Sequence, residues 1–337
     1  MSRLQLSGVI PSPPVIYTDE TCRQIDYEGY RRHLQHLLAH DIGALCIGGH
    51  AGETECLTMD ERLKVIDIAV AEAKGRVPVI GGVIADSTHA AIDQALLQKA
   101  RGVDAVLVCP PNIIGWDAER ADAMHLAHFS AFDRATQIPF LIYGGPGDGT
   151  SYRQLPQTFR KLAENCEHLV AWKIPVRGVA TGPNSFAECV AALKAAGEVS
   201  GRTVTPLVAG DANFYGALEA GAGGNVNACE SVRVDDNVAL YAAFSKGDRD
   251  TARAIHEKSQ ALSDAIYGVR IGRSFAYFHY RFKIASWMLG YIDNPAMRLP
   301  QVPPPADEIP LIHDALIKSG RKPVRSAADY KPSIALM

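Results

Sequence analysis

Short apolar runs alternate along the chain with longer segments in which apolar residues recur every three or four positions. The apolar runs, bounded by Gly, Pro or Asp, are typical of buried strands, and the wider spacing is typical of amphipathic helices. The predicted strands are residues 9–17, 44–49, 77–83, 103–111, 138–147, 169–176, 205–211 and 221–229. The predicted helices are residues 27–40, 60–75, 89–102, 117–136, 155–165, 186–196, 212–220 and 238–244.

This alternation amounts to about eight strand–helix pairs, with no linker or change of composition between them. Strands that alternate with helices form parallel sheets, and this repeat favours a closed (β/α)₈ barrel, a TIM barrel, over an open doubly wound sheet. After Lys246 the helical pattern continues without strands, over residues 249–266, 273–289 and 309–319. We therefore expect a barrel domain at 1–246, a C-terminal helical extension at 247–320 and a tail at 321–337.

Composition narrows the class of protein. A chain of 337 residues, 47% of them hydrophobic, can bury a large core. The net charge of -3 and the scattered Lys and Arg residues argue against nucleic acid as a partner. No stretch approaches the roughly 18 uncharged apolar residues of a membrane helix, and no signal peptide is visible, so we expect a cytoplasmic protein without membrane contact. The seven cysteines form no CxxC pair, which predicts reduced thiols and no metal site.

One lysine, Lys173, lies in the middle of the otherwise apolar run at 169–176. Strict alternation places it on the same face as Leu169, Ala171 and Pro175. Its ammonium group can reach solvent from a strand end. Alternatively, burial depresses its pKa and leaves a neutral amine that attacks a carbonyl to form a Schiff base.

In a barrel of this kind the reactive groups lie at the carboxyl ends of the strands. Candidates at those ends are residues 49–53, Pro110–Asn112, Tyr143, Lys173, Gly210, Asp211, Asn225 and Asn227. The turn that begins at Gly49 either presents the amides of His50 and Ala51 to a carboxylate or is a plain tight turn. Tyr143 either relays protons to a nitrogen bound at Lys173 or belongs to the core or rim.

Four motifs make the order of these residues recognisable: GGHAGE at 48–53, IYGGPG at 142–147, WKIP at 172–175 and AGDA at 209–212. With these motifs the chain resembles, over residues 7–320, the dihydrodipicolinate synthase and N-acetylneuraminate lyase family. The resemblance implies a class I, Schiff-base-forming, pyruvate-linked lyase on a (β/α)₈ barrel with a C-terminal helical extension.

The resemblance also implies roles for particular residues. Lys173 would form an imine with a 2-oxo acid, and Tyr143 would shuttle protons as bonds form or break. The amides of His50 and Ala51 would bind the carboxylate, and the backbone carbonyl of Val226 would contact the substrate. The partners implied are a 2-oxo acid, an aldehyde and further copies of the chain in a tetramer or dimer. No metal or organic cofactor is implied, because the lysine itself serves as the electron sink.

Several positions depart from the family pattern. Where many relatives carry Thr or Ser, this chain has His50 and Ala51. Pro111 and Asn112 stand where dihydrodipicolinate synthase places a tyrosine pair that reaches between subunits. Asp148 replaces the arginine that holds the carboxylate of the second substrate. Each departure argues against lysine biosynthesis.

The departures leave alternatives for the residues concerned. His50 either replaces the missing hydroxyl as a proton donor or base, or contributes only its amide. Asp148 either binds a hydroxyl or amine of the second substrate or is a solvated loop residue. Glu53 caps or orients the loop, and Asn112 and Asn227 are candidates for lining the pocket by their position.

We expect an aldolase that forms or cleaves a carbon–carbon bond between pyruvate and an aldehyde. The alternative within the family is a dehydratase of a 2-keto-3-deoxy sugar acid or a related hydroxylated 2-oxo acid. A third reading is a non-catalytic barrel that binds a 2-oxo acid, and the presence of both Lys173 and Tyr143 weighs against it.

Overall fold

The structure, a computed structural model, describes residues 4–146, 152–175 and 185–332. Within these ranges eight parallel strands form one sheet in the order β1-β8-β7-β6-β5-β4-β3-β2. The strands are β1 Gly8–Pro11, β2 Leu45–Ile47, β3 Val79–Val83, β4 Ala105–Val108, β5 Phe140–Tyr143, β6 Leu169–Pro175, β7 Thr205–Ala209 and β8 Gly224–Asn227. The Gly43 amide donates to the Val9 carbonyl at 2.8 Å, which brings β1 to the start of β2 and almost closes the barrel.

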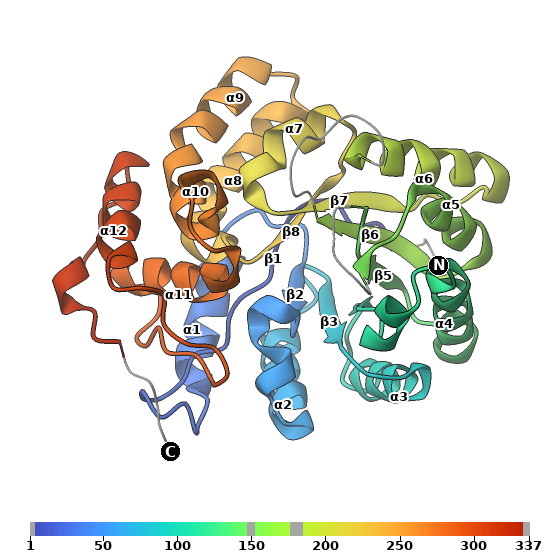
Figure 1. The fold of residues 1–337 in the computed structure, drawn as a ribbon, viewed down its shortest axis with the longest axis horizontal. Coiled ribbons are helices and arrows are strands. Elements are labelled where there is room, and N and C mark those ends of the chain that lie inside the picture. Colours follow the sequence, from blue (N-terminus) through green and yellow to red (C-terminus); the bar gives the residue numbers. More distant parts are fainter. Residues whose placement is uncertain (1–3, 147–151, 176–184, 333–337) are drawn as a thin grey trace.

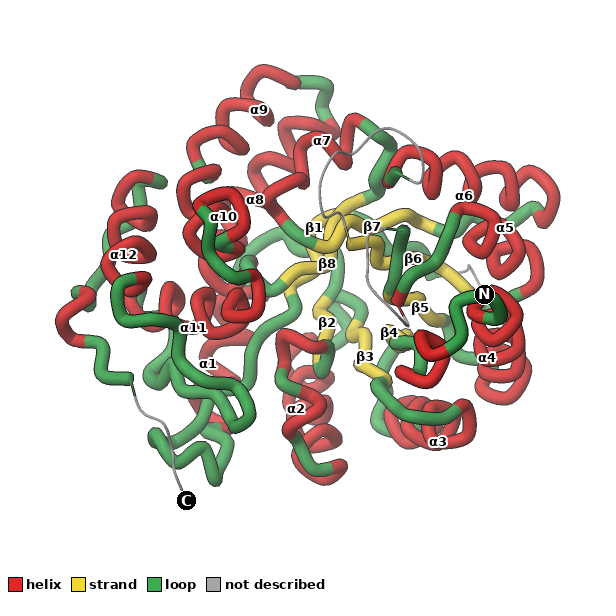
Figure 2. The backbone as a smooth tube through the Cα atoms, in the orientation of Figure 1, coloured by secondary structure: helices red, strands yellow, loops and turns green. Residues whose placement is uncertain are grey.

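Helices surround this sheet on its outside (Figures 1 and 2). They are α1 Tyr27–Leu38, α2 Met59–Ala73, α3 Thr88–Lys99, α4 Ala121–Thr136, α5 Pro156–Asn165, α6 Phe186–Ser200, α7 Phe214–Glu219 and α8 Glu230–Ser245. The expected (β/α)₈ barrel is confirmed. Thr58 and Glu61 form the capping box that begins α2. The first strand ends at Pro11 rather than near Tyr17, because the prolines that follow lack the N–H a strand must donate.

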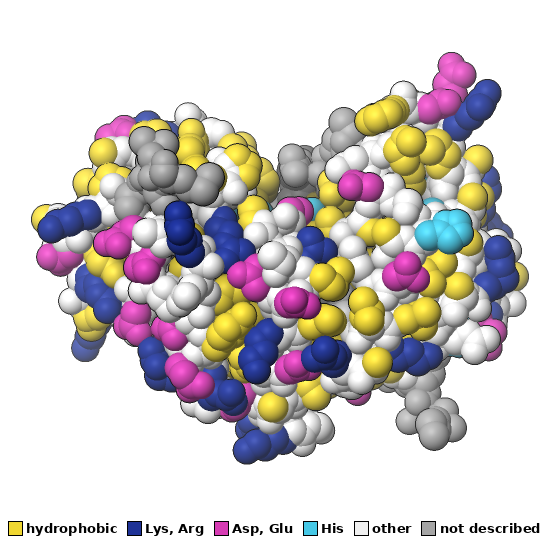
Figure 3. Space-filling view, turned by 90° about the horizontal axis from the view of Figure 1, so that it is seen from below, with side chains coloured by type: hydrophobic (Ala, Val, Ile, Leu, Met, Phe, Trp, Pro, Cys, Tyr) yellow, Lys and Arg dark blue, Asp and Glu magenta, His cyan; other side chains and the backbone are white. Residues whose placement is uncertain are grey.

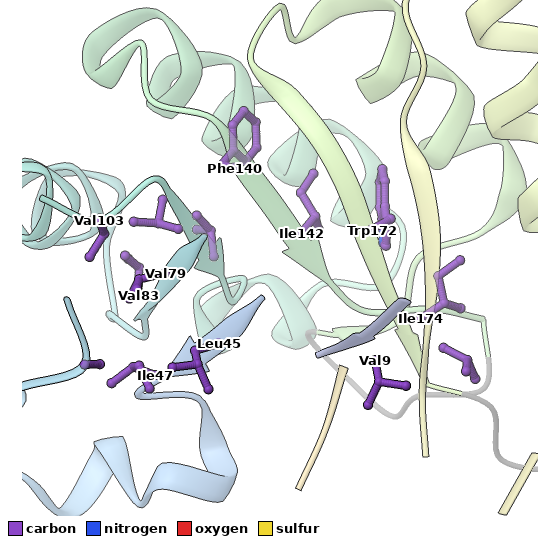
Figure 4. Close-up of a cluster of buried hydrophobic side chains, with 14 of the residues drawn as sticks. Val9, Leu45, Ile47, Val79, Val83, Val103, Phe140, Ile142, Trp172 and Ile174 are labelled. Carbon is purple, nitrogen blue, oxygen red and sulfur yellow. The ribbon is translucent and has the colours of Figure 1, made fainter. Parts of the chain in front are cut away.

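The core has two apolar layers, one between the barrel and the surrounding helices and one inside the barrel. Side chains between the strands and the helices form the outer layer, part of which Figure 4 shows around Phe140, Ile142 and Trp172. A smaller cluster fills the interior, with Ile10, Cys46, Ile80, Leu107, Leu141, Ala171, Leu207 and Val226 among its members. The Trp172 ring stacks on Phe159 with centroids 3.8 Å apart, which fixes the outward face of β6.

The sides of the sheet to which the β6 side chains point differ in part from the prediction. Phe140 pairs with Leu169 but Leu141 pairs with Ala171, so Val170 is the extra residue of a β-bulge. Leu169 consequently packs in the outer layer, while Val170 and Ala171 both lie in the interior cluster. The prediction that Leu169 shares a face with Lys173 was therefore wrong. Strict alternation holds only after the bulge, and the pairing of the two strands sets where the bulge falls.

The C-terminal extension comprises α9 Arg249–Lys258, α10 Gln260–Tyr267, α11 Phe278–Met288 and α12 Glu308–Lys318. It packs beside α8 and α1 around a second apolar cluster, to which the barrel contributes Ile16, Ala51 and Val232 (Figure 1). The helix predicted over 249–266 is broken at Ser259, whose carbonyl accepts a hydrogen bond from buried Arg233. Beyond α12, Arg321 pairs with Asp235 at 2.7 Å, so the described part of the tail is attached to α8.

On the face in Figure 3, acidic and basic side chains are interspersed, so no gathered patch of one sign marks this side of the molecule. None of the helices in the described ranges is long and apolar enough to cross a membrane. All seven cysteines lie within those ranges, and no two of them form a disulfide.

Candidate active site

Lys173 and Tyr143 lie side by side at the carboxyl ends of neighbouring strands. They are paired in the register of β5 and β6, and the Lys173 Nζ lies 5.3 Å from the centroid of the Tyr143 ring. Tyr143 packs against the interior cluster. Burial raises the pKa of the Cys46 thiol in that cluster, and the charge of Lys173 acts in the opposite direction. The lysine head group therefore faces the barrel interior, and the side chain is only partly exposed.

The glycine turn after β2 is one turn of 3₁₀ helix, η1, His50–Gly52. The Gly52 amide donates to the Gly49 carbonyl at 2.9 Å and the Glu53 amide to the His50 carbonyl at 3.0 Å. The turn follows β2 so closely that a Cβ at Gly82 of β3 would lie 1.7 Å from the Gly48 carbonyl oxygen. The amides of His50 and Ala51 belong to the first residues of η1.

The His50 ring lies beside Tyr143 at the mouth of the barrel, with ring centroids 5.4 Å apart. Its Nε2 is 3.2 Å from the Tyr152 hydroxyl and 3.3 Å from a carboxylate oxygen of Glu55. Its Nδ1 faces the buried Cys109 sulfur at 3.9 Å. A carboxylate only accepts hydrogen bonds, so Nε2 donates to Glu55 whenever it carries a proton. The Glu55 carboxylate also stabilises the protonated ring.

Glu53 ties the same turn to the C-terminal extension. One oxygen of its carboxylate accepts from the Lys283 ammonium at 2.9 Å, and the other accepts from the Tyr17 hydroxyl and the Arg298 amide, both at 3.1 Å. Burial, and then the Glu53 charge, raise the pKa of Tyr17 far above its ordinary value. Glu53 itself has φ 54°, a left-handed conformation that this network holds in place. Its contacts are those of a residue that orients the loop.

The eighth strand brings Val226 and Asn227 to the same end of the barrel. Val226 belongs to the interior cluster. The Asn227 Oδ1 accepts from the Tyr267 hydroxyl of α10 at 3.1 Å. Its Nδ2 is buried and has no hydrogen-bond partner within the described ranges. Asn227 thus joins the strand end to the extension and offers a buried donor there.

The remaining candidates are less central. Asn112 begins a 3₁₀ helix, η3, Asn112–Trp116, and is exposed. Asp148 lies outside the described residues. Of the candidates predicted from the sequence, Tyr143, Lys173 and His50 lie together. Asn112 lies at the exposed rim.

Two groups at the mouth of the barrel were not expected from the sequence. Tyr152 reaches His50 as described above. His279 of α11 is the other, and its pKa is lowered to about 3, first by burial and then by the positive charges of His50 and Lys173. His279 is consequently neutral at pH 7 and lies within reach of their charges. Spacing along the chain holds no signal for it, because α11 reaches the barrel mouth only through tertiary packing.

The described residues contain no group of three His, Cys, Asp or Glu side chains placed to hold a metal ion.

This chain is similar in sequence to proteins of one known family. The sequence model of the Dihydrodipicolinate synthetase family matches residues 5–318. The chain is 29% identical over 244 residues to the 4-hydroxy-tetrahydrodipicolinate synthase of Maridesulfovibrio salexigens, an alignment that covers 72% of this chain and 78% of that protein.

Two solved structures share the fold. The dihydrodipicolinate synthase of Thermotoga maritima is similar with a TM-score of 0.81 at 23% identity, over 94% of this chain and 99% of that one. A prophage protein of the dihydrodipicolinic acid synthase family from E. coli K12, solved in complex with pyruvate, gives 0.80 at 20% identity, again over 94% and 99%. At these identities the likeness concerns the fold.

Proposed function

Because this chain belongs to the Dihydrodipicolinate synthetase family, whose members are class I Schiff-base lyases, we propose that it is an aldolase acting through an imine between Lys173 and a 2-oxo acid. The observation that carries the proposal is the position of the Lys173 Nζ, 5.3 Å from the Tyr143 ring centroid and facing the barrel interior. The relative solved with pyruvate supports pyruvate as the 2-oxo acid.

The chemistry begins with the lysine nitrogen. The neutral amine attacks the 2-oxo carbon, and the resulting carbinolamine loses its oxygen as water to give an iminium. Tyr143, beside the nitrogen, carries protons between the attacking amine and the leaving oxygen. The amides of His50 and Ala51 bind the substrate carboxylate, which holds the 2-oxo carbon against Lys173.

The iminium then serves as the electron sink. In the cleavage direction a base removes the proton from the hydroxyl at C4, and the C3–C4 bond breaks. Its electron pair forms the enamine, and an aldehyde leaves. In the reverse direction the enamine carbon attacks the aldehyde. We place Val226, with its carbonyl, and Asn227, with its buried Nδ2, along this part of the substrate.

The second substrate differs from that of lysine biosynthesis. Asn112 stands exposed where dihydrodipicolinate synthase places its inter-subunit tyrosine pair. Asp148 stands where that enzyme has an arginine for a carboxylate, and an aspartate would repel one. We therefore infer an aldehyde without a carboxylate at this position. A hydroxyl or amine group there would suit Asp148.

The alternative, a dehydratase, is favoured by one observation. His50 is paired with Glu55 at 3.3 Å, and an imidazolium stabilised in this way can donate a proton to a departing hydroxyl group. In that reaction the enamine forms by loss of a proton from C3, and the hydroxyl at C4 leaves as water while the carbon skeleton stays intact.

A screen of hydroxylated 2-oxo acids with product analysis separates the two functions. An aldolase releases free pyruvate and an aldehyde, whereas a dehydratase gives a dehydrated 2-oxo acid with the same number of carbons. Lys173→Ala should abolish either reaction, and the exposed Lys194→Ala should leave it unchanged. Turnover that survives in the Lys173→Ala protein would overturn the proposal.

We also infer that the protein is a homo-oligomer, a dimer or tetramer. The support is an apolar pair on η3, where Ile113 is 49% exposed and Trp116 is 83% exposed. Large apolar side chains grouped in this way are typical of contact surfaces. The pair follows β4, the position from which relatives reach between subunits.

A further inference from the structure

Three aromatic rings from distant parts of one chain are packed together at the barrel mouth. The His50 and Tyr143 centroids are 5.4 Å apart, those of His50 and Tyr152 5.6 Å, and those of Tyr143 and Tyr152 5.3 Å. Tyr143 is the member that also lies under the Lys173 Nζ, 5.3 Å from it. The three rings therefore form a compact group with Lys173 on one side.

Backbone hydrogen bonds hold Tyr152 in this group. The Gly145 amide donates to the Tyr152 carbonyl at 3.0 Å, and the Gln154 amide donates back to the Gly145 carbonyl at 3.3 Å. Gly144 has φ +143°, and a Cβ there would lie 2.5 Å from the Tyr152 carbonyl oxygen. The two glycines after Tyr143 thus leave the space in which the chain returns to the end of β5.

A route to solvent leads away from the same group. The His50 Nε2 lies 3.2 Å from the Tyr152 hydroxyl and 3.3 Å from Glu55, whose side chain is 44% exposed. Both contacts are made by the same ring nitrogen, so the protonated His50 ring can give its Nε2 proton to Glu55 and then accept one at Nε2 from the Tyr152 hydroxyl. Tyr143 is partly buried and its ring packs against both His50 and Tyr152, which places it beside this route.

We propose that Tyr152 is a positioning residue that, with His50, completes within a single chain the proton relay serving Tyr143. The proposal rests on the imine chemistry proposed above. The relay takes the place of the hydroxyl that Ala51 lacks, and it does so without a residue from another subunit. Each active site is then complete in its own chain, even in an oligomer.

The proton count of imine formation shows what the relay does. The Lys173 ammonium gives one proton to the relay before its nitrogen attacks the 2-oxo carbon. A second proton moves from the nitrogen to the oxygen of the carbinolamine. The relay then returns its proton to that oxygen, the C–O bond breaks, and water leaves. The balance is ammonium plus ketone to iminium plus water, with no proton gained or lost.

Tyr152→Phe tests the relay, because it removes the hydroxyl and keeps the ring. The measurement is the rate at which borohydride and pyruvate label Lys173, followed over time and over pH. We expect labelling about a hundredfold slower than in the unmutated protein, with the same final extent, which is the lower end of what a positioned acid or base contributes. The pH profile of the rate should change shape. Tyr27→Phe, a partly buried tyrosine of α1, serves as the matched control.

Three outcomes decide between the proposals. Unchanged labelling kinetics in a folded Tyr152→Phe protein would overturn the relay and leave the proposed function standing. Absence of label on Lys173 in the unmutated protein would overturn both. His50→Gln should slow labelling as well, and the double variant should be no slower than the slower single one, because the two residues act as one unit.

Subunit mixing tests whether the relay lies within one chain. Lys173→Ala and Tyr152→Phe chains are coexpressed and the mixed oligomer is isolated. With the relay inside each chain, every active site keeps the defect of its own chain, so mixing restores no activity. Recovery of activity would show that Tyr152 serves the lysine of a neighbouring chain and would contradict the proposal. Equal melting temperatures of the variants exclude loss of folding as the cause.

Discussion

The carboxylate of Glu53 accepts a hydrogen bond from the buried ammonium group of Lys283 at 2.9 Å, although the two residues lie 230 positions apart. Glu53 ends the glycine turn beside Lys173, and Lys283 belongs to α11 of the extension. The extension therefore holds the turn in place through an ion pair whose two side chains are 0% and 1% exposed.

Removal of one partner of this pair should destabilise the fold. Lys283→Met leaves the Glu53 carboxylate buried and unpaired, which costs about 3–5 kcal/mol in comparable sites. The midpoint of urea unfolding should fall accordingly. Lys283→Met combined with Glu53→Gln should be more stable than Lys283→Met alone, because no unpaired charge remains. A double variant that is less stable by the sum of both effects would contradict this account.

Stability should decrease in mild acid because of buried neutral histidines. Burial lowers the pKa of His33 to about 3 and that of His125 to about 4, whereas the ordinary value is about 6.5. Below about pH 6.5 the unfolded chain takes up protons that the folded chain does not, so stability falls as pH falls. Each such group contributes up to about 1.4 kcal/mol per pH unit.

Thermal unfolding measured between pH 7 and pH 5 checks this loss of stability in acid. The melting temperature should fall over the interval, and less steeply in His125→Phe, which keeps a buried ring without a titrating group. Parallel curves for the two proteins would show that His125 already binds a proton in the fold.

Loss of the Tyr143 hydroxyl should reduce turnover more than binding. Tyr143→Phe removes a group that transfers protons, and such groups contribute about 100-fold to 10,000-fold to rates. We expect kcat to fall within that range while KM changes little. Tyr30→Phe, which alters a fully buried tyrosine away from the site, is the comparison. A fall confined to KM would assign Tyr143 to binding instead.

The exposed pair on η3 makes the state of assembly testable. Trp116→Ser removes the side chain that is 83% exposed, and it should shift the molar mass measured by light scattering toward that of one chain. Val324→Ser, at a site 72% exposed on the tail, is the control and should leave the mass unchanged. A single-chain mass in the unmutated protein would refute the oligomer.

Periodicity predicted the barrel because the strand and helix patterns are local and repeat along the whole chain. The sequence placed Lys173 and Tyr143 together for the same reason, since both stand at the ends of recognisable strands that are neighbours in the sheet. Leu169 was assigned to the wrong face because the bulge at Val170 arises from the pairing of two strands and not from the order of residues in one.

Contacts between distant segments carried no sequence signal. Tyr152 meets His50 across 102 positions, and its place depends on how the backbone returns at Gly145. His279 lies on α11 of the extension, and only tertiary packing brings it within reach of the charge of Lys173. The motifs located the strand ends of the site, while the partners that surround them follow from tertiary structure.

The most direct test is to reduce the protein with borohydride in the presence of pyruvate and map the label by peptide mass spectrometry. An irreversible adduct on the peptide that carries Lys173, absent without pyruvate and absent from Lys173→Ala, is the predicted result. A protein that stays unlabelled, or one labelled at other lysines only, would contradict the covalent mechanism.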